Sequence, residues 1–502
     1  MNHPSSETHL LSSCPESAAG EALIAARWQT EIVPALERYI ALPALSPAFD
    51  PDWEANGHVE SAVQLVLGWI KARRIAGMAV NVQRLAGRTP LIVVEVAPFG
   101  SDKFLGQRTS AESPSDGTVV LYGHLDKQPE MLGWREGLAP WTPVRDGDRL
   151  YGRGGADDGY AAFASLTAIE AVQAAGGNHG RCVVLVEASE ESGSPDLPAH
   201  VKALAAWLGA VDLVLCLDSG CATYDTLWLT TSLRGVVSVT LDVQVLTEGV
   251  HSGSASGVVP SSFRIMRQLL DRIEDAATGR VLLSSATVAV PEHRINEALA
   301  TSIVLGDAER FPTVDGLQLM TSGASEALLA RTWRPALSVT GADGLPPTGR
   351  AGNVLRPRTA LKLSLRIPPT ADPEAVMAEL RSVLLADPPS GATVRISEAD
   401  VAPGWNAPDL EPWLAAALEG ASRHRFGRSM QLMGEGGTIP FMGMLGERFP
   451  AAQFVITGVL GPDSNAHGPN EFLDVAYAEQ LTRCLADVLV AHAANLGAHA
   501  AR

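Results

Sequence analysis

Short apolar runs that alternate with helical segments constrain the fold of this chain most strongly. Apolar runs bounded by turn residues lie at 89–98, 117–126, 181–191 and 210–220. The segments 156–177 and 200–209 between them have the apolar spacing of helices, as do 21–42 and 59–76 nearer the start. Strands that are apolar along their whole length belong to sheets with helices on both faces. The pattern therefore predicts an α/β domain.

The pattern changes near Leu233. Strands with alternating apolar and polar residues are predicted at 234–247, 359–369 and 392–400, interleaved with helices at 261–277 and 373–387. This order predicts a small α+β domain. The alternation of helices and apolar strands then resumes, with a helix at 408–427 and an apolar strand at 451–461. We therefore expect a disordered tail at 1–20, a main domain formed by 21–232 and 401–502, and an inserted domain at 233–400.

Charge and hydropathy disfavour several classes of partner. The 502 residues include 38 Lys and Arg and 56 Asp and Glu, for a net charge of −18. Nucleic acids and anionic membranes both require basic patches, so neither is an expected partner. No segment approaches the roughly 18 to 20 apolar residues of a membrane span. The first 20 residues lack the basic flank and apolar core of a signal peptide.

The five cysteines are scattered and form no CxxC pair. They are Cys14, Cys182, Cys216, Cys221 and Cys484. Scattered cysteines in odd number are typical of reduced thiols, so we expect a cytoplasmic protein.

Polar residues follow the predicted strands at the end where open α/β sheets bind their ligands. Five of them are candidate metal ligands: His124, Asp157, Glu191, Asp218 and His467. Imidazole and carboxylate groups together suit zinc, manganese or cobalt rather than calcium. Five ligands are too many for one four-coordinate ion, but they suit two ions that share a bridging carboxylate. The sequence therefore predicts two divalent metal ions.

The adjacent carboxylates of Glu190 and Glu191 need different roles. Two cations would offset their mutual repulsion. A metal-bound water that attacks a carbonyl must lose a proton, and a free carboxylate beside it can accept that proton and pass it to the leaving amine. One glutamate is thus expected to bind metal and the other to act as general base. Asp126, two residues after His124, is placed to accept the other N–H of the imidazole.

Each of these motifs has a plainer interpretation when taken alone. His-x-Asp triplets are common, and Asp157-Asp158 is compatible with an ordinary helix N-cap. Glu190-Glu191 is compatible with a solvated turn, and Asp218 with the end of a strand. All of them occur at the ends of predicted elements, and this agreement favours the metal site.

The motifs GHLD, GRGGADD, EESGS, CLDS and HGPNE, in this order, resemble the M20 family of metallopeptidases. Within that family they are most similar to the carnosinase-like cytosolic nonspecific dipeptidases. The resemblance extends from about Glu21 to the C-terminus. It implies a zinc-exopeptidase-type α/β catalytic domain with a mixed sheet flanked by helices, and an inserted α+β domain that acts in dimerisation or as a lid. It also implies a homodimer with two divalent metal ions, Zn²⁺ first and Mn²⁺ or Co²⁺ as alternatives.

The resemblance implies a role for each candidate ligand. His124 and Asp218 would bind one metal ion. Glu191 and His467 would bind the other, and Asp157 would bridge the two.

The resemblance also assigns the catalytic groups. Glu190 would be the general base, and Asp126 would hold His124. His251 lies in GVHSG at 249–253, a motif whose histidine would reach the active site of the partner subunit and stabilise the oxyanion. The plainer interpretation of His251 is a histidine in a surface loop.

Five further residues resemble substrate contacts. They are Asn353, Arg366, Gly436, Gly437 and Thr438. Asn353 would contact the substrate amide or the oxyanion. Arg366 would pair with the terminal carboxylate, which a guanidinium can bind through two hydrogen bonds, and the Gly-Gly-Thr segment would donate to the same carboxylate. The plainer interpretation of Arg366 is an exposed charge on an alternating strand.

The chain departs from the family pattern beside the bridging acid. The family usually has Asp-Asp-Lys-Gly, whereas this chain has Asp157-Asp158-Gly159-Tyr160. The candidate ligands are intact, so hydrolysis is still expected. The change puts a close substrate analogy with the dipeptidases in question.

The function predicted is hydrolysis of an amide next to a free carboxylate, as in a dipeptidase or other metallopeptidase of carboxypeptidase type, with a small peptide as substrate. An N-acyl amino acid hydrolase, such as an aminoacylase or desuccinylase, shares every metal ligand and the base, so the sequence leaves this alternative open. A binding protein that keeps the fold without catalysis is the third alternative, and the complete ligand set disfavours it.

Overall fold

The computed structural model describes residues 18–101, 104–105, 117–306 and 313–500. The chain forms two compact units. Unit 1 comprises Met1–Thr230, Pro408–Leu432 and Met444–Arg502, and unit 2 comprises Thr231–Ala407 and Met433–Gly443. Unit 2 begins two residues before and ends seven residues after the insertion expected at 233–400, and it also includes the later segment Met433–Gly443, which lies within the range 401–502 expected for the main domain.

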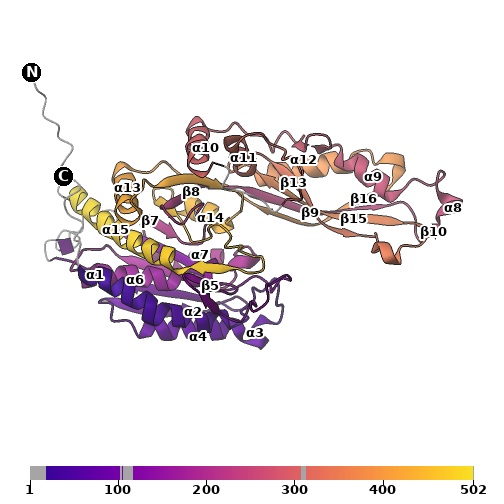
Figure 1. The fold of residues 1–502 in the computed structure, drawn as a ribbon. Helices are drawn as coiled ribbons and strands as arrows, with labels where there is room; N and C mark the ends of the chain where they lie inside the picture. The colour runs from indigo at the N-terminus through magenta and orange to yellow at the C-terminus, as the bar shows by residue number, and fades with distance from the viewer. Residues whose placement is uncertain (1–17, 102–103, 106–116, 307–312, 501–502) are drawn as a thin grey trace, which may run out of the picture. The chain divides into compact units, whose positions relative to one another are not determined.

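Unit 1 contains a six-stranded sheet in the order β1-β2-β6-β3-β7-β19, of which Figure 1 labels β7. Its strands are β1 (Met78–Gln83), β2 (Leu91–Val96), β3 (Thr118–His124), β6 (Cys182–Glu187), β7 (Val211–Cys216) and β19 (Gln453–Ile456). The strands β6, β3, β7 and β19 pair in parallel, whereas β2 pairs antiparallel with both β1 and β6. The predicted α/β fold with a mixed sheet is confirmed.

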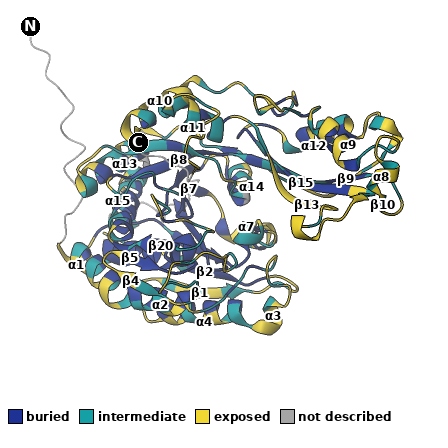
Figure 2. Ribbon diagram, turned by 45° about the vertical axis from the view of Figure 1, so that its right-hand side comes forward, coloured by how far each residue is buried: buried dark blue, intermediate teal, exposed yellow. Residues whose placement is uncertain are grey.

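The central strands are buried on both faces because helices pack against the sheet. Every residue of β3 and β6 is buried. Figure 2 shows dark blue, the colour of buried residues, along much of β2 and β7 in the same sheet. Helix α6 (Ala161–Ala174) contacts β3 and β6, and it lies against α1 (Ala18–Arg27) and α15 (Val475–Ala500). This position explains why α6 is apolar around almost its whole circumference. The remaining longer helices of unit 1 are α2 (Val33–Ile40), α4 (His58–Lys71), α7 (Leu197–Leu208) and α13 (Pro412–Phe426). Helix α14 (Pro440–Arg448) begins in unit 2 and continues into unit 1.

The segment predicted as one helix at 21–42 is interrupted. Helix α1 passes through a π-helical turn, η1 (Trp28–Ile32), before α2 begins at Val33. Pro34 has no backbone N–H to donate to Thr30, so the regular hydrogen-bond ladder cannot continue through this point. The first described residue, Ala18, is already helical. Most of the expected tail at 1–20 lies outside the described residues.

Unit 2 is built around a four-stranded antiparallel sheet in the order β13-β15-β9-β16. The strands are β13 (Ala336–Asp343), β15 (Arg358–Ile367), β9 (Gly235–Gln244) and β16 (Thr393–Ala402). Burial alternates along β9 as the sequence predicted, and its inward residues form one core with residues of α9 (Ser262–Leu270) and α12 (Pro373–Leu385). Unit 2 also contains α10 (Glu292–Leu305) and α11 (Ala324–Thr332).

Two expectations from composition concern the described residues. Cys182, Cys216, Cys221 and Cys484 are buried and form no disulfide with one another, whereas Cys14 lies outside the described residues. Within the described part of the chain, no helix combines the length and apolar character that crossing a membrane requires.

Candidate metal centre

The five candidate ligands lie at the ends of strands of unit 1 or in the connections that follow them. His124 is the last residue of β3, Glu191 lies in the 3₁₀ turn Glu190–Ser192 after β6, and Asp218 lies two residues beyond β7. Because these three strands are parallel, their carboxyl ends meet at one edge of the sheet. Asp157 lies in the π-helical turn η2 (Gly155–Gly159) before α6, and His467 lies in the connection between β19 and β20 (Phe472–Asp474).

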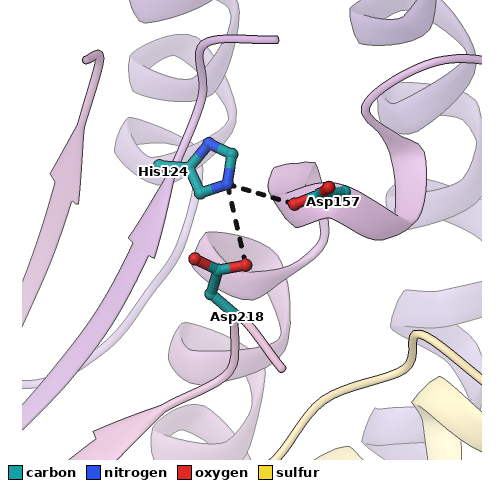
Figure 3. A group of neighbouring side chains, drawn as sticks. All are labelled: His124, Asp157 and Asp218. Carbon is teal, nitrogen blue, oxygen red and sulfur yellow. Dashed lines mark hydrogen bonds and ion pairs between the residues drawn. The ribbon is translucent and has the colours of Figure 1, made fainter. Parts of the chain in front are cut away.

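The first group of ligands consists of His124, Asp157 and Asp218 (Figure 3). The Nε2 atom of His124 lies 3.3 Å from Oδ1 of Asp157 and 3.8 Å from Oδ1 of Asp218. All three residues are buried, and their candidate ligand atoms lie within 4.8 Å of one another. One cation among them would replace these close contacts with coordination bonds.

The second group consists of Asp157, Glu191 and His467. The Nε2 atom of His467 lies 3.0 Å from Oδ2 of Asp157 and 3.3 Å from Oε2 of Glu191. Asp157 therefore belongs to both groups, with Oδ1 facing His124 and Oδ2 facing His467. A carboxylate with one oxygen toward each group can bridge two ions.

The protonation equilibria show how strongly these groups act on one another. Burial alone would lower the pKa of His467, but the hydrogen bond and charge of Asp157 raise it to about 9. Burial, followed by the charge of Asp157, raises the pKa of Glu191 to about 8. Burial also raises the pKa of Asp218. Carboxylates gathered out of water favour bound cations, so two imidazoles with three carboxylates fit a pair of divalent ions.

Asp126 organises the turn that carries the two glutamates. Its Oδ1 accepts a hydrogen bond of 3.1 Å from the backbone N–H of Glu190, and its Oδ2 accepts one of 3.0 Å from that of Glu191. The Nδ1 atom of His124 lies 3.1 Å from the backbone carbonyl oxygen of Asp126 and 3.5 Å from its carboxylate. Asp126 thus contacts His124 mainly through its backbone, and its side chain fixes the glutamate turn.

The backbone before His124 has no room for a side chain. A Cβ atom on Gly123 would lie 2.5 Å from Cβ of Ala161 and 2.7 Å from Oδ2 of Asp158. That same Asp158 oxygen lies 3.3 Å from the backbone N–H of His124, which donates to it. The close approach of β3 to the start of α6 brings His124 and Asp157 together.

Comparison with known proteins decides the family. The model of peptidase family M20/M25/M40 matches residues 120–491, which is most of the chain. The protein is a member of this peptidase family. The resemblance noted in the motifs is therefore confirmed, and the chain is a metallopeptidase with a candidate metal-binding cluster.

Individual relatives are similar over most of their length. The cysteinylglycine-S-conjugate dipeptidase of Corynebacterium striatum is 28% identical over 390 residues, covering 75% of this chain and 81% of the relative. The human Beta-Ala-His dipeptidase is 25% identical over 458 residues, covering 88% and 86%. Among solved structures, the di-peptidase Dug1p of Saccharomyces cerevisiae has the same fold, with a TM-score of 0.73, 21% identity and coverage of 96% of this chain and 99% of that one.

A buried ion pair that the sequence did not reveal joins two of the M20 ligand loops. Arg153 precedes the turn of Asp157, and Glu471 follows the loop of His467. The two side chains form an ion pair in which both are buried. Glu471 Oε1 also accepts from the backbone N–H of Gly154 at 2.8 Å, and Arg153 Nη2 donates to the carbonyl of Gly468 at 2.9 Å.

Strand pairing explains how residues so far apart in sequence meet. Strand β5 (Arg149–Tyr151) leads directly into Arg153, and it pairs antiparallel with β20, which directly follows Glu471. The two loops therefore leave the same pair of strands. The motifs GRGG and HGPNE contained the signal, but only the pairing of these short strands shows that they face each other.

Two polar residues next to Asp126 were not predicted, and one of them contacts a candidate metal ligand. Gln128 donates from Nε2 to Oε2 of Glu191 at 2.7 Å. Lys127 is fully buried and donates to the carbonyl oxygens of Tyr39 at 2.7 Å and Leu42 at 2.9 Å, at the C-terminal end of α2. These carbonyls accept from it because the last carbonyls of a helix have no partner within the helix. Burial lowers the pKa of Lys127 well below its ordinary value. Both residues directly follow Asp126, but their types alone gave no sign of these contacts.

The remaining predicted site residues lie in unit 2, in two places. His251 ends the short strand β10 (Val250–His251), which pairs with β14 (Val354–Leu355), so His251 and Asn353 are close along this ribbon. His251 is exposed, and its Nδ1 accepts from the backbone N–H of Gly253 at 3.1 Å. Arg366 lies near the end of β15 and donates from Nη1 to Oγ1 of Thr438 at 2.7 Å. Gly436 and Gly437 directly precede that threonine.

Proposed function

We propose that this M20 metallopeptidase is a dipeptidase that hydrolyses the amide bond of a small peptide next to its free carboxylate. The observation that carries this proposal is the pair of ligand groups that share Asp157, with Glu190 adjacent to one of the ligands. The names of the Corynebacterium and human relatives, both called dipeptidases, support the substrate class.

The ligand assignment follows the two groups. His124 and Asp218 would hold one ion and Glu191 and His467 the other, with Asp157 shared. We propose Zn²⁺ for both positions, with Mn²⁺ or Co²⁺ as alternatives, since this donor set suits all three. Bound there, the ions would supply Lewis acidity for the carbonyl and the attacking water.

Glu190 is proposed as the general base. Its backbone is held by Asp126, and its carboxylate belongs to neither ligand group. Burial, followed by the negative charge of Asp218, raises the pKa of Glu190 well above its ordinary value. A carboxylate with increased proton affinity can accept the proton of the attacking water and then donate it to the leaving amine.

Residues of unit 2 are proposed to bind the substrate. Arg366, supported by Thr438, would pair with the free carboxylate, and Asn353 would contact the amide or the oxyanion. The backbone N–H groups of Gly436 and Gly437 would donate to the same carboxylate. His251 would stabilise the oxyanion in the active site of a partner subunit.

We further propose that the protein is a cytoplasmic homodimer in which unit 2 serves dimerisation or acts as a lid. Light scattering on the full chain tests the assembly directly. A mass near twice that of one chain is expected, and a clean monomer would contradict the proposed role of His251 in a partner's site.

The decisive experiment for the activity is a hydrolysis screen on the full-length protein loaded with Zn²⁺ or Mn²⁺. The panel contains dipeptides, including β-alanyl ones, beside N-acetyl, N-succinyl and long-chain N-acyl amino acids, with products identified by mass spectrometry. Cleavage of dipeptides is expected. Cleavage confined to the N-acyl compounds would contradict the dipeptidase proposal and identify an acyl amino acid hydrolase.

A further inference from the structure

Two arginines of unit 2 lie at the same end of its sheet. Arg234 immediately precedes β9, and Arg366 lies one residue before the end of β15. The two strands are paired, with Arg366 opposite Val236 and Ile367 opposite Gly235. The side chains therefore start from neighbouring strands within two residues of each other in register.

Thr438 and Gly436 hold both arginines in place. Thr438 accepts from Nη1 of Arg366 at 2.7 Å and donates to the backbone carbonyl of Arg234 at 2.5 Å. The Nε atom of Arg234 donates to the carbonyl of Gly436 at 3.1 Å. A Cβ atom on Gly436 would approach Nη2 of Arg234 to 3.2 Å, so a glycine lets this guanidinium lie against the backbone.

Neither arginine has an acidic partner. Among the described residues, no carboxylate lies within ion-pair distance of Arg234 or Arg366, and the Nη2 atom of each makes no hydrogen bond. Neither Nη2 is a buried unsatisfied atom, so both remain accessible to a ligand. Arg294, in the same unit, differs: it pairs with Glu297 at 2.5 Å and also donates to Asn406 and Ala407.

The electrostatics of the pair agree with this geometry. Burial, followed by the charges of Arg366 and Arg331, lowers the pKa of Arg234 to about 10. Burial also lowers the pKa of Arg366. Like charges held together in a half-buried place, without a carboxylate of the chain between them, favour a bound anion.

We propose that Arg234 and Arg366 together form a subsite for two carboxylates, which selects substrates whose C-terminal residue is aspartate or glutamate. The inference rests on the proposed function, in which Arg366 binds the main-chain carboxylate. Arg234 then binds the side-chain carboxylate through its accessible Nη2. The chain as a whole carries a net charge of −18 and repels anions at long range, so such a preference must arise locally.

The test compares substrates that differ only in this charge. For the metal-loaded full-length enzyme, kcat/KM is measured on Ala-Glu against Ala-Gln and on Ala-Asp against Ala-Asn. A preference for the acid of about 10-fold or more is expected, the size typical of a hydrogen bond to a charged group. If the wild-type ratio of kcat/KM for the acidic dipeptide to that for the amide dipeptide lies within about threefold of one, the inference is wrong.

Variants test whether Arg234 causes the preference for an acidic C-terminal residue. Arg234→Gln is expected to reduce the acid-to-amide ratio at least fivefold, and Arg234→Lys to retain part of it. Arg334→Gln is the matched control, because it removes one charge from the same unit at a residue that pairs with Glu326 at 2.6 Å. Thermal unfolding of each variant confirms folding, and competitive inhibition by free glutamate against free glutamine gives a second readout.

The outcomes separate the two proposals. Equal cleavage of acidic and amide dipeptides, or an undiminished ratio in Arg234→Gln, overturns the subsite while the dipeptidase stands. Absence of cleavage for every dipeptide overturns the proposed function, and the subsite with it.

Discussion

Replacing Glu471 by glutamine tests whether the buried ion pair with Arg153 holds the two ligand loops. The side chain of Arg153 is 1% exposed and that of Glu471 is 0% exposed, so the variant leaves a guanidinium charge buried without its counter-ion. Removing one partner of a buried pair typically costs about 3–5 kcal/mol of stability. The glutamine keeps an oxygen that can accept from the N–H of Gly154. The decrease in the free energy of unfolding therefore comes mainly from losing the carboxylate charge of Glu471.

The free energy of unfolding is measured in urea on the metal-free protein, so that lost metal binding does not contribute. Glu60→Gln is the matched control, since Glu60 pairs with Arg84 in unit 1 and the two side chains are 43% and 53% exposed. An exposed pair contributes about 0–1 kcal/mol. The double variant Arg153→Met/Glu471→Gln removes both charges and is expected to lose less than the sum of the two single losses.

The reasoning would be refuted if Glu471→Gln lost no more stability than Glu60→Gln. It would equally be refuted if the two single losses simply added in the double variant, because no charge coupling would then exist between the loops.

Three further predictions concern catalysis and metal binding. Glu190→Gln should lower kcat about 10²- to 10⁴-fold, the usual contribution of a general base, while the metal content measured by mass spectrometry stays at the wild-type value. A near-wild-type kcat would exclude Glu190 as the general base. Metal affinity, measured by chelator competition, should rise from pH 6 to 9. The pKa of His467 is about 9 and that of Glu191 about 8, so at neutral pH a metal ion must displace protons from these ligands. An affinity that fell with rising pH would contradict this. His251→Ala should lower kcat more than it changes KM, since an oxyanion contact forms late in the reaction; a change in KM alone would remove that role.

The candidate metal ligands could be predicted because of where they stand in the pattern. His124, Glu191 and Asp218 each follow an apolar strand, and parallel strands place such residues at one edge. This prediction did not require the order of the strands in the sheet, because all parallel strands of one sheet have their carboxyl ends at the same edge.

Other features depend on contacts that local pattern does not encode. The pairing of β5 with β20 joins segments more than 300 residues apart, so the ion pair of Arg153 and Glu471 could not be foreseen. The segment Met433–Gly443, which carries Thr438, belongs to unit 2, although in sequence it lies beyond residue 400, where the α/β pattern has already resumed. Short segments of this kind are placed by a few hydrogen bonds, such as that from Arg366, rather than by periodicity.

The most direct test of the account is anomalous diffraction from crystals of the zinc-loaded protein, with data collected on both sides of the zinc absorption edge. We expect two peaks about 3.5–4 Å apart on either side of Asp157. One peak should lie beside His124 and Asp218, and the other beside Glu191 and His467. A single peak, or peaks away from these five residues, would contradict the dinuclear centre.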